Sequence, residues 1–467
     1  MSTSSADHMT DLPHELLPAT GRALLHRLAV AQSEGRAPSV VAGVVRDGRP
    51  VWSGARSMTD GHAPTPDVQY RIGSLTKTFV AVLVLRLRDE GLLGLADPLS
   101  RHLPGTPADD ATIAQLLSHT SGLAAETPGP WWERTEGTLR PGLDDLLEAE
   151  RPLKHPAGRL HHYSNPGYAL LGALVAELRG KPWGEVLHRE VLAPLGMDRT
   201  TLLPEHPHAG GFAVHPWADV LQPEPLTDTG LMGPAGQLWS TGADLARWAA
   251  FLAAGDDKVL SADTLAEMRR PAAAPDDSGW NSAYGFGLQL RRHQGRLLYG
   301  HTGSMPGFTA GLWVSEADGL AAYALANATS GAATAQLAAE LITLTAEHEP
   351  RLPEPWRPLA EVDDDLLDLT GPWYWGAAPN TLRLRAGRIL ELAPLAGHGR
   401  GSRFRPEPDG TWTGLDDYYA GETLRVVRRA DGTVSHLDLG SFVYTREPYG
   451  PAPAVPGGVD PEGWRGM

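Results

Sequence analysis

Residues 72–79 read IGSLTKTF, and the chain runs on as VAVLVLRLRDEGLL, an apolar stretch that predicts a buried helix ending near Gly91. Ser74 and Lys77 are three residues apart, so on a helix their side chains lie on one face. Free N–H groups and the dipole at a helix N-terminus favour negative charge developing on a serine oxygen. A lysine held in apolar surroundings has a lowered pKa and can act as a base. The stretch therefore predicts either a nucleophile with its base, or a serine N-cap followed by a lysine whose ammonium reaches solvent.

The composition excludes several classes of protein. The 467 residues carry a net charge of −16, whereas a nucleic-acid-binding protein would carry the opposite sign. There is no cysteine, which excludes disulfides, thiolate catalysis and thiolate metal sites. The first residues lack a secretory pattern, and no apolar run approaches the roughly 20 residues that span a bilayer. We therefore expect a soluble, cytoplasmic protein without a nucleic-acid or membrane partner.

Two regions of strand character enclose a helical middle. Residues 39–54 read SVVAGVVRDGRPVWSG, two β-branched runs around Asp47-Gly48 that predict a hairpin. Residues 100–270 are mainly helical or loop, with Gly180 as a helix stop. Strand patterns return in YGFGLQL, GRLLYGHTGS, FTAGLWV and LAAYALAN, before a last helix. The pattern predicts one sheet built from segments distant in sequence.

A second, smaller domain follows a proline-rich linker. Residues 349–358 read EPRLPEPWRP, with four prolines in ten positions. After it, short alternating runs are separated by turn dipeptides, which predict a small antiparallel barrel or sandwich. These dipeptides are Ala386-Gly387, Asp409-Gly410, Ala420-Gly421 and Asp431-Gly432. We assign residues 1–348 to a catalytic domain, 349–360 to the linker and 361–467 to an all-β domain.

The segment HHYSNPGYALLG, residues 161–172, supplies candidate partners for Ser74 and Lys77. Tyr163 and Asn165 alternate onto one side of an extended or turn segment before Pro166. A phenol beside an ammonium can be stabilised as a phenolate and serve as a general base. The Asn165 amide can hold the lysine or a substrate carbonyl. Alternatively, Asn165 only caps the following helix.

The segment GHTGSMPG, residues 300–307, lies in a strand-like context. Gly303 would let a substrate lie close to the strand, and the backbone N–H of Ser304 could join that of Ser74 in an oxyanion hole. The alternative is an ordinary glycine-rich turn.

Taken together, Ser-x-x-Lys, Tyr-x-Asn and the His-Thr-Gly strand resemble the serine β-lactamase and penicillin-binding-protein superfamily, in its class C-like branch. The resemblance covers about residues 20–345. It extends beyond the three motifs to the surrounding segments YRIGSLTKTF, IAQLLSHTSGL, YSNPGYALLGALVAE, LAPLGMDRT, GQLWSTGADLARW and YGFGL. It implies an α+β fold, in which an antiparallel sheet with flanking helices is joined to an all-helical lobe. It also implies the acylated nucleophile Ser74, its acid/base partners Lys77 and Tyr163, the positioning group Asn165 and the third-motif residue His301. No metal and no cofactor is implied.

The third motif departs from the usual pattern of that superfamily. It begins with His301 where β-lactamases and cell-wall peptidases usually have a lysine that helps bind a substrate carboxylate. A histidine with an ordinary pKa is mostly uncharged at neutral pH. We therefore expect β-lactams to be poor substrates, and anionic substrates to react better as His301 becomes protonated.

The C-terminal domain resembles the lipocalin-like domain of some D-stereospecific peptidases and of penicillin-binding-protein-type thioesterases, which release and cyclise nonribosomal peptides. The favoured function is a serine acyltransferase that takes a peptidyl thioester, with a D-residue at its C-terminus, onto Ser74. The substrate, free or held by a carrier protein, would leave by intramolecular aminolysis as a macrocycle. The alternative is a hydrolytic D-stereospecific peptidase or esterase. A sensor or inactive scaffold is disfavoured, since all four residues of the first two motifs are present.

Two further residues are candidates for substrate binding. Trp313, on the strand after His301, could form an aromatic wall or belong to the core. Arg446, at the end of the last barrel strand, could reach over the cleft or take part in surface packing.

Overall fold

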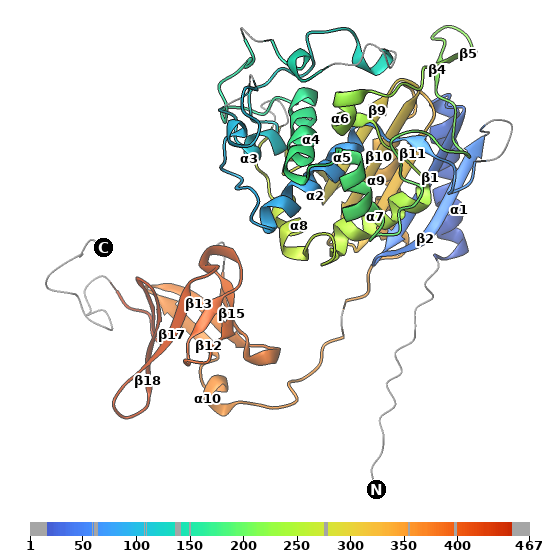
Figure 1. The fold of residues 1–467 in the computed structure, drawn as a ribbon. Coiled ribbons are helices and arrows are strands. Elements are labelled where there is room, and N and C mark those ends of the chain that lie inside the picture. Colours follow the sequence, from blue (N-terminus) through green and yellow to red (C-terminus); the bar gives the residue numbers. More distant parts are fainter. Residues whose placement is uncertain are drawn as a thin grey trace. The chain divides into compact units, whose positions relative to one another are not determined.

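The chain divides into two compact units, Met1–Leu352 and Pro353–Met467 (Figure 1). The structure is a computed structural model and describes residues 16–450 apart from 58, 60–63, 107, 109, 136–141, 149–150, 275–278, 354 and 397–398. Among the helices of these residues, none is long and apolar enough to cross a membrane.

Seven strands form one antiparallel sheet in the first unit, in the order β2-β1-β11-β10-β9-β8-β7. They are β1 (Ser39–Arg46), β2 (Arg49–Ser57), β7 (Ser282–Tyr284), β8 (Gln289–His293), β9 (Arg296–Met305), β10 (Phe308–Ser315) and β11 (Leu320–Ala326). Val40 of β1 lies opposite Ala326 of β11, so the sheet does join both ends of the unit, as predicted. Asp47 and Gly48 both have positive φ, 46° and 76°, which is the backbone that a two-residue hairpin turn requires.

Helices cover both faces of the sheet. They are α1 (Pro18–Glu34), α2 (Thr76–Asp89), α3 (Ile113–Leu117), α4 (Asn165–Arg179), α5 (Trp183–Leu187), α6 (Gly233–Gly236), α7 (Gly242–Ala254), α8 (Ala262–Met268) and α9 (Thr334–His348). Side chains alternate along the strands, so β1 and β11 contribute to two separate cores. One core packs against α1 and α9, and the other against α2, α4 and α7. The helical lobe therefore lies on the face of the sheet against which α2 packs.

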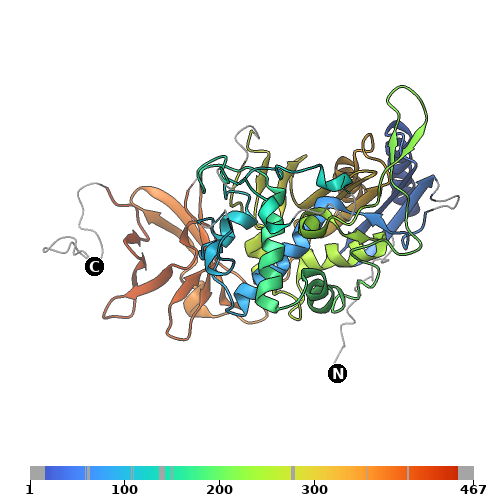
Figure 2. The ribbon, with the colours of Figure 1, turned by 45° about the horizontal axis from the view of Figure 1, so that its top comes forward.

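Short strands complete the unit. They are β3 (Tyr70–Arg71), which pairs with β6 (Trp239–Ser240), and β4 (Phe212–Val214), which pairs with β5 (Leu221–Pro223). The hairpin of β4 and β5 stands out from the rest of the unit in both ribbon views (Figures 1 and 2).

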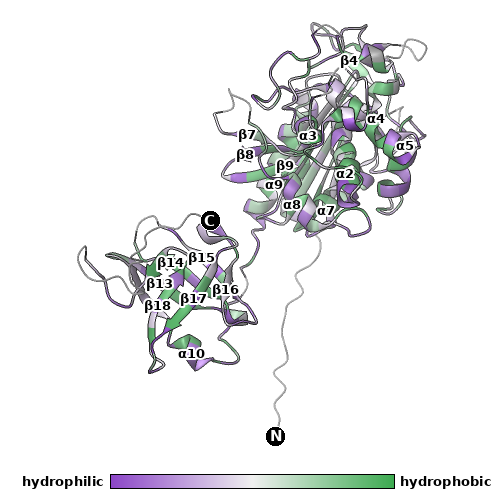
Figure 3. Cartoon of the chain, turned by 60° about the vertical axis from the view of Figure 1, so that its left-hand side comes forward, coloured by the Kyte–Doolittle hydropathy of each residue, from purple (hydrophilic) through white to green (hydrophobic). Residues whose placement is uncertain are grey.

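Helix α2 is the buried helix that the sequence predicts, and it is coloured mainly hydrophobic in Figure 3. Eleven of its 14 residues are buried, and Phe79 stacks on Trp248 of α7 with ring centroids 3.7 Å apart. A single turn of 3₁₀-helix, Gly73–Leu75, precedes it, and Gly91 follows it with a φ of 75°. The candidate nucleophile Ser74 thus lies in the turn that opens a rigid, buried element.

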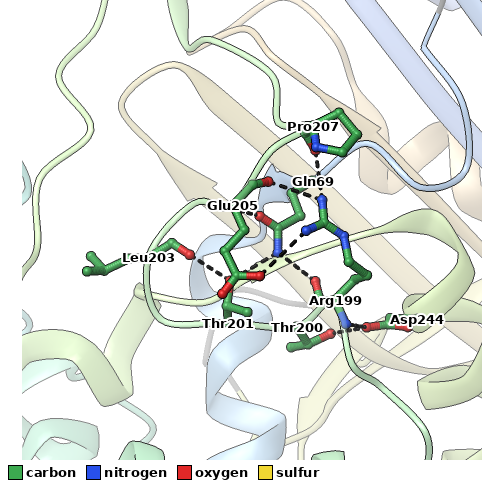
Figure 4. Close-up of polar contacts among 8 residues, drawn as sticks. All are labelled: Gln69, Arg199, Thr200, Thr201, Leu203, Glu205, Pro207 and Asp244. Atoms are coloured by element: carbon green, nitrogen blue, oxygen red, sulfur yellow. Dashed lines mark hydrogen bonds and ion pairs between the residues drawn. The ribbon is translucent and has the colours of Figure 1, made fainter.

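A polar network anchors the segment that leads into this turn (Figure 4). The side-chain amide of Gln69, just before β3, donates to the Arg199 carbonyl at 2.8 Å and to Thr201 Oγ1 at 3.0 Å. Its oxygen accepts from the backbone N–H of Glu205 at 2.6 Å. The backbone N–H of Arg199 in turn donates to the Asp244 carboxylate of α7 at 3.0 Å. The start of the catalytic segment is therefore tied to both a loop and a helix.

The second unit is a nearly closed barrel of eight antiparallel strands that follow one another in chain order. After the short helix α10 (Asp364–Leu367) they are β12 (Gly371–Trp375), β13 (Ala378–Leu384), β14 (Leu390–Pro394), β15 (Ser402–Pro406), β16 (Trp412–Gly414), β17 (Thr423–Arg428), β18 (Val434–Leu439) and β19 (Phe442–Tyr444). Tyr374 and Thr445 exchange backbone hydrogen bonds of 2.7 and 2.9 Å, which bring the first and last strands together. The fold class is thus the predicted one, an α+β catalytic fold and a lipocalin-like barrel.

The barrel interior is a packed core. Trp373, Phe404 and Tyr419 are all fully buried within it. The four predicted turn dipeptides all lie between consecutive strands, and each of their glycines has positive φ.

Candidate active site

Ser74 and Lys77 are in contact, as their spacing predicts. Ser74 is partly exposed, whereas Lys77 is completely buried. The Lys77 amine is 3.0 Å from Ser74 Oγ, 2.7 Å from Asn165 Oδ1 and 2.6 Å from the Ala235 carbonyl oxygen. All three directions available to the nitrogen are therefore occupied by oxygen atoms.

The Lys77 amine is poised between its two protonation states. Burial lowers its pKa from 10.5 to about 7, while the negative charges of Glu126 and Glu133 oppose this shift. Near neutral pH a substantial share of Lys77 is unprotonated, and this form can take the Ser74 proton. The predicted general base is thus supported by burial as well as by distance.

Tyr163 approaches the same serine from the segment before α4. Its hydroxyl is hydrogen-bonded to the Ser74 side chain, and its ring centroid is 4.9 Å from Lys77 Nζ. The phenolate expected from the sequence is not favoured, because burial raises the Tyr163 pKa far above its usual value. Tyr163 therefore holds its proton in the resting site and is suited to relay protons between Ser74 and a leaving group.

Asn165 is free to contact Lys77 because another residue caps the helix. Ser164 is the N-cap of α4, and its hydroxyl accepts from the Gly167 N–H at 3.1 Å. The alternative role for Asn165, that of a simple helix cap, is therefore wrong. Its amide nitrogen donates to Glu126 Oε1 at 2.6 Å, which leaves its oxygen for Lys77.

Strand β9 passes directly alongside the turn that carries Ser74. A Cβ atom on Gly303 would lie 1.9 Å from the Ile72 carbonyl oxygen, and one on Gly73 would lie 2.6 Å from the Ser304 nitrogen. The glycine at position 303 is thus required by the close approach of the chain's own backbone. This close approach brings the amides of Ser74 and Ser304 together, as an oxyanion hole requires.

His301 is completely buried beside the catalytic residues. Its Nδ1 lies 2.5 Å from the Thr302 carbonyl oxygen, which can only accept, so the proton is on Nδ1. Its Nε2 therefore accepts from the Tyr284 hydroxyl at 3.0 Å. Burial, with the charge of Lys77, lowers its pKa to about 3. His301 is thus uncharged at neutral pH, as expected, but the expected protonation in mildly acidic solution is not supported, and this residue acts as a neutral hydrogen-bonding group.

His119 is a site residue that lies outside the three sequence motifs, in the segment IAQLLSHTSGL. It is fully buried with a φ of 57°, and its Nδ1 accepts from the Ser164 N–H at 3.0 Å. Its ring centroid lies 4.1 Å from that of Tyr163 and 4.7 Å from that of Tyr284. His119 thus supports the tyrosine and the start of α4 together. A histidine with positive φ gives no signal in a sequence.

A cleft of about 500 Å³ opens in front of Ser74. It is lined by Ser74, Tyr163, Gln289, Arg291, Thr302, Gly303, Ser304, Thr309, Ala310 and residues 332–336. The Gln289 side chain of β8 donates to Thr302 Oγ1 of β9 and accepts from the Thr302 backbone N–H, both at 3.2 Å. Arg291 donates to the neutral Gln336 amide oxygen at 2.9 Å, so its charge is available to an anionic group in the cleft.

Two further predicted substrate-binding residues each have contacts within their own unit. Trp313 is only 2% exposed and belongs to the core between the sheet and α9, where its Nε1 donates to the Ala335 carbonyl at 2.9 Å. The aromatic-wall prediction is wrong, because this side chain is enclosed on the α9 side of β10. Arg446 donates to the Thr370 carbonyl at 2.9 Å and to that of Asp368, and it stacks on Trp373 at 4.1 Å. Within the barrel unit its guanidinium is thus engaged by its own backbone.

The family model described as Beta-lactamase matches residues 22–347, well over half of the chain. The chain belongs to the beta-lactamase family. It is a serine hydrolase of the β-lactamase and penicillin-binding-protein superfamily. Residues 362–446 of the barrel match a domain of unknown function.

Known relatives of this beta-lactamase-family chain include penicillin-binding protein 4 of Amycolatopsis lactamdurans. The two are 31% identical over 391 residues, which are 76% of this chain and 97% of the relative. Among solved structures, a D-stereospecific amidohydrolase from Streptomyces sp. has a TM-score of 0.59 and 24% identity. The match covers 71% of this chain and 99% of that one. SurE with D-Leu has a TM-score of 0.55 and 24% identity, over 92% of this chain and 100% of that one. These structural matches show that the fold is shared.

Proposed function

We propose that the protein transfers the acyl group of a peptidyl thioester with a C-terminal D-residue to Ser74 and releases it as a macrocyclic peptide. The observation that carries the acyl-enzyme step is the contact of Ser74 Oγ with the buried amine of Lys77 at 3.0 Å. The D-configuration is supported by the likeness to a D-stereospecific amidohydrolase and to SurE with D-Leu.

Acylation follows from the positions of the side chains. Unprotonated Lys77 takes the Ser74 proton while Oγ attacks the thioester carbonyl carbon. The amides of Ser74 and Ser304 stabilise the resulting oxyanion. The carbon–sulfur bond then breaks, and the thiolate leaves as a thiol after receiving the proton through Lys77 and Tyr163. Ser74 is left as an ester of the peptide.

In the cyclising step, the peptide's own amine attacks this ester. Its N–H proton passes to unprotonated Lys77, the ester bond between the acyl carbon and Ser74 Oγ breaks, and Lys77 returns a proton to Ser74 Oγ through Tyr163 as the amide bond forms. Intramolecular attack gains a large effective molarity only if the peptide is held folded near Ser74. This step is supported by the resemblance of the barrel to the C-terminal domain of penicillin-binding-protein-type thioesterases, which cyclise nonribosomal peptides.

A second candidate is hydrolysis of D-configured peptides, amides or esters, in which water attacks the same ester. The likeness to the D-stereospecific amidohydrolase over nearly its full length favours it. The two candidates share Ser74, Lys77 and Tyr163 and differ only in the acceptor.

The test is mass spectrometry of the products from peptidyl thioesters that differ only in a D- or L-residue at the C-terminus. We expect a covalent adduct that Ser74→Ala abolishes, and cyclic product from the D-series. Linear acid as the sole product from every D-terminal thioester would assign the protein to the hydrolases. An adduct that persists in Ser74→Ala would refute the nucleophile itself.

A further inference from the structure

Glu126 is linked to the catalytic lysine through one intervening side chain. Its Oε1 accepts from Asn165 Nδ2 at 2.6 Å, and its Oε2 accepts from Trp132 Nε1 at 2.9 Å. The oxygen of the same Asn165 amide accepts from Lys77 Nζ at 2.7 Å. A carboxylate, an amide and an amine therefore form a continuous chain that ends at Ser74.

The carboxylate determines which way the amide points. An amide has a donor end and an acceptor end, whereas an ionised carboxylate only accepts. Asn165 must therefore turn Nδ2 toward Glu126 and Oδ1 toward Lys77. In the reversed orientation an N–H group would face Lys77 and bind the lone pair that the base needs.

The orientation of the amide in turn determines where the Lys77 lone pair points. An unprotonated amine has two N–H groups and one lone pair. The Asn165 oxygen and the Ala235 carbonyl, at 2.7 and 2.6 Å, accept the two N–H groups. The remaining direction is that of Ser74 Oγ at 3.0 Å.

We propose that Glu126 is a positioning residue, which holds the Asn165 amide so that unprotonated Lys77 directs its lone pair at Ser74. This role rests on the proposed function only in taking Ser74 as nucleophile and Lys77 as base. It requires neither a D-configured substrate nor cyclisation.

Glu126 also contributes charge at the lysine. The ionisable groups around Lys77 are Glu126, Glu133, His119, His301, Tyr163 and Tyr168. Of these, Glu126 and then Glu133 raise the Lys77 pKa. Glu133 is bound by Trp131 Nε1 at 2.8 Å and has no bond to Asn165, so Glu133→Gln is a matched control that changes charge alone.

The experiment separates positioning from charge. The full-length protein is acylated with p-nitrophenyl acetate, which carries no amine, and the burst rate is measured from pH 5 to pH 9. We expect Glu126→Ala to lower the high-pH plateau by roughly 10- to 100-fold, as loss of a base's alignment does. Glu133→Gln should move the midpoint to lower pH and leave the plateau unchanged. An unchanged plateau in Glu126→Ala, or an equal loss in Glu133→Gln, would overturn the proposal.

A second readout needs no substrate. The sequence contains four lysines, Lys77, Lys154, Lys181 and Lys258, so selective ε-¹³C-lysine labelling gives few NMR signals, and Lys77→Arg assigns one of them. We expect the Lys77 signal to titrate near pH 7, and its midpoint to fall further in Glu126→Ala than in Glu133→Gln. An equal or absent shift contradicts the charge contribution of Glu126 at Lys77, whereas the acylation plateau decides its positioning role. Acylation of the wild type by the ester without any cyclic product from thioesters would refute the proposed cyclisation and leave the test of Glu126 intact.

An amine-binding role for Glu126 predicts a different result. Loss of activity confined to the KM of amine-bearing substrates, with p-nitrophenyl acetate unaffected, would make Glu126 a substrate contact and overturn the positioning role. Dispersed signals from the other three lysines verify that each variant is folded.

Discussion

Tyr284 donates a hydrogen bond of 3.0 Å to Nε2 of His301, whose proton is on Nδ1, and burial keeps this third-motif histidine neutral by lowering its pKa. The usual lysine of this motif would present a positive charge at the same position. In this protein a neutral histidine therefore stands where the motif usually has a positively charged side chain.

His301 should give no advantage to anionic substrates at low pH. Because its pKa lies near 3, it stays neutral between pH 5 and pH 8. The measurement is kcat/KM for a carboxylate-bearing ester and for its methyl-capped analogue, across this range. We expect their ratio to stay flat, apart from titration of the substrate itself, and β-lactams to be turned over poorly. A ratio that rises several-fold as the pH falls through 6.5 would show that the histidine becomes protonated.

Lys77 should make the stability of the catalytic unit depend on pH. The folded protein loses the Lys77 proton near pH 7, while the unfolded chain loses it near 10.5. The unfolded state thus binds more protons between these values, and stability increases with pH by about 2 kcal/mol from pH 7 to pH 9. Urea denaturation at both pH values measures this difference. In Lys77→Met the increase should disappear, and an unchanged increase would contradict burial of the amine.

Lys77 and Tyr163 should behave as one proton-transfer unit. Each single change, Lys77→Ala or Tyr163→Phe, is expected to lower turnover by roughly 10²–10⁴-fold. The double variant should lose far less than the product of the two effects, because both side chains contact the same Ser74 oxygen. The acylation rates of the wild type, the two single variants and the double variant form a double-mutant cycle. If the two losses multiply, Lys77 and Tyr163 have separate roles.

Arg291 should favour substrates that carry a carboxylate near the reacting carbonyl. It lines the cleft, and its hydrogen-bond partner Gln336 is uncharged. Arg291→Gln is expected to lower kcat/KM for such substrates by roughly tenfold or more, because a charge-assisted hydrogen bond usually contributes this much. Amide-capped analogues serve as the control and should be unaffected. Equal losses for both series would point to a structural role in holding α9.

Arg446 should matter for the stability of the barrel. Its guanidinium binds the carbonyls of Thr370 and Asp368 and stacks on Trp373. Arg446→Ala is therefore expected to destabilise the barrel by about 1–3 kcal/mol. Thermal unfolding followed by tryptophan fluorescence measures this loss. A variant of unchanged stability that yields more linear product would instead restore Arg446 as a substrate contact.

Features that depend on short-range spacing could be predicted from the sequence. Ser74 and Lys77 are one helical turn apart, and α2 is apolar nearly all round, so their contact follows from local geometry. The turns at Asp47-Gly48 and in the barrel were recognisable because glycine tolerates positive φ. The two-unit organisation was visible because a proline-rich segment separates two different patterns.

Other features depend on which distant groups share a buried space. The sequence placed His301 in the motif, but its neutral state depends on burial and on the charge of Lys77. Trp313 follows the motif strand closely, yet the direction of its side chain depends on the pairing of β10 in the sheet.

By itself, the sequence determined the fold class and the set Ser74, Lys77, Tyr163 and Asn165, because these residues lie in motifs whose geometry is local. Only the tertiary structure decided how that set is protonated and oriented. Glu126 lies 39 residues before Asn165, and nothing in its own segment marks it as part of the site. Its contact exists because folding brings that loop to the start of α4, where desolvation and the direction of each hydrogen bond determine the state of Lys77.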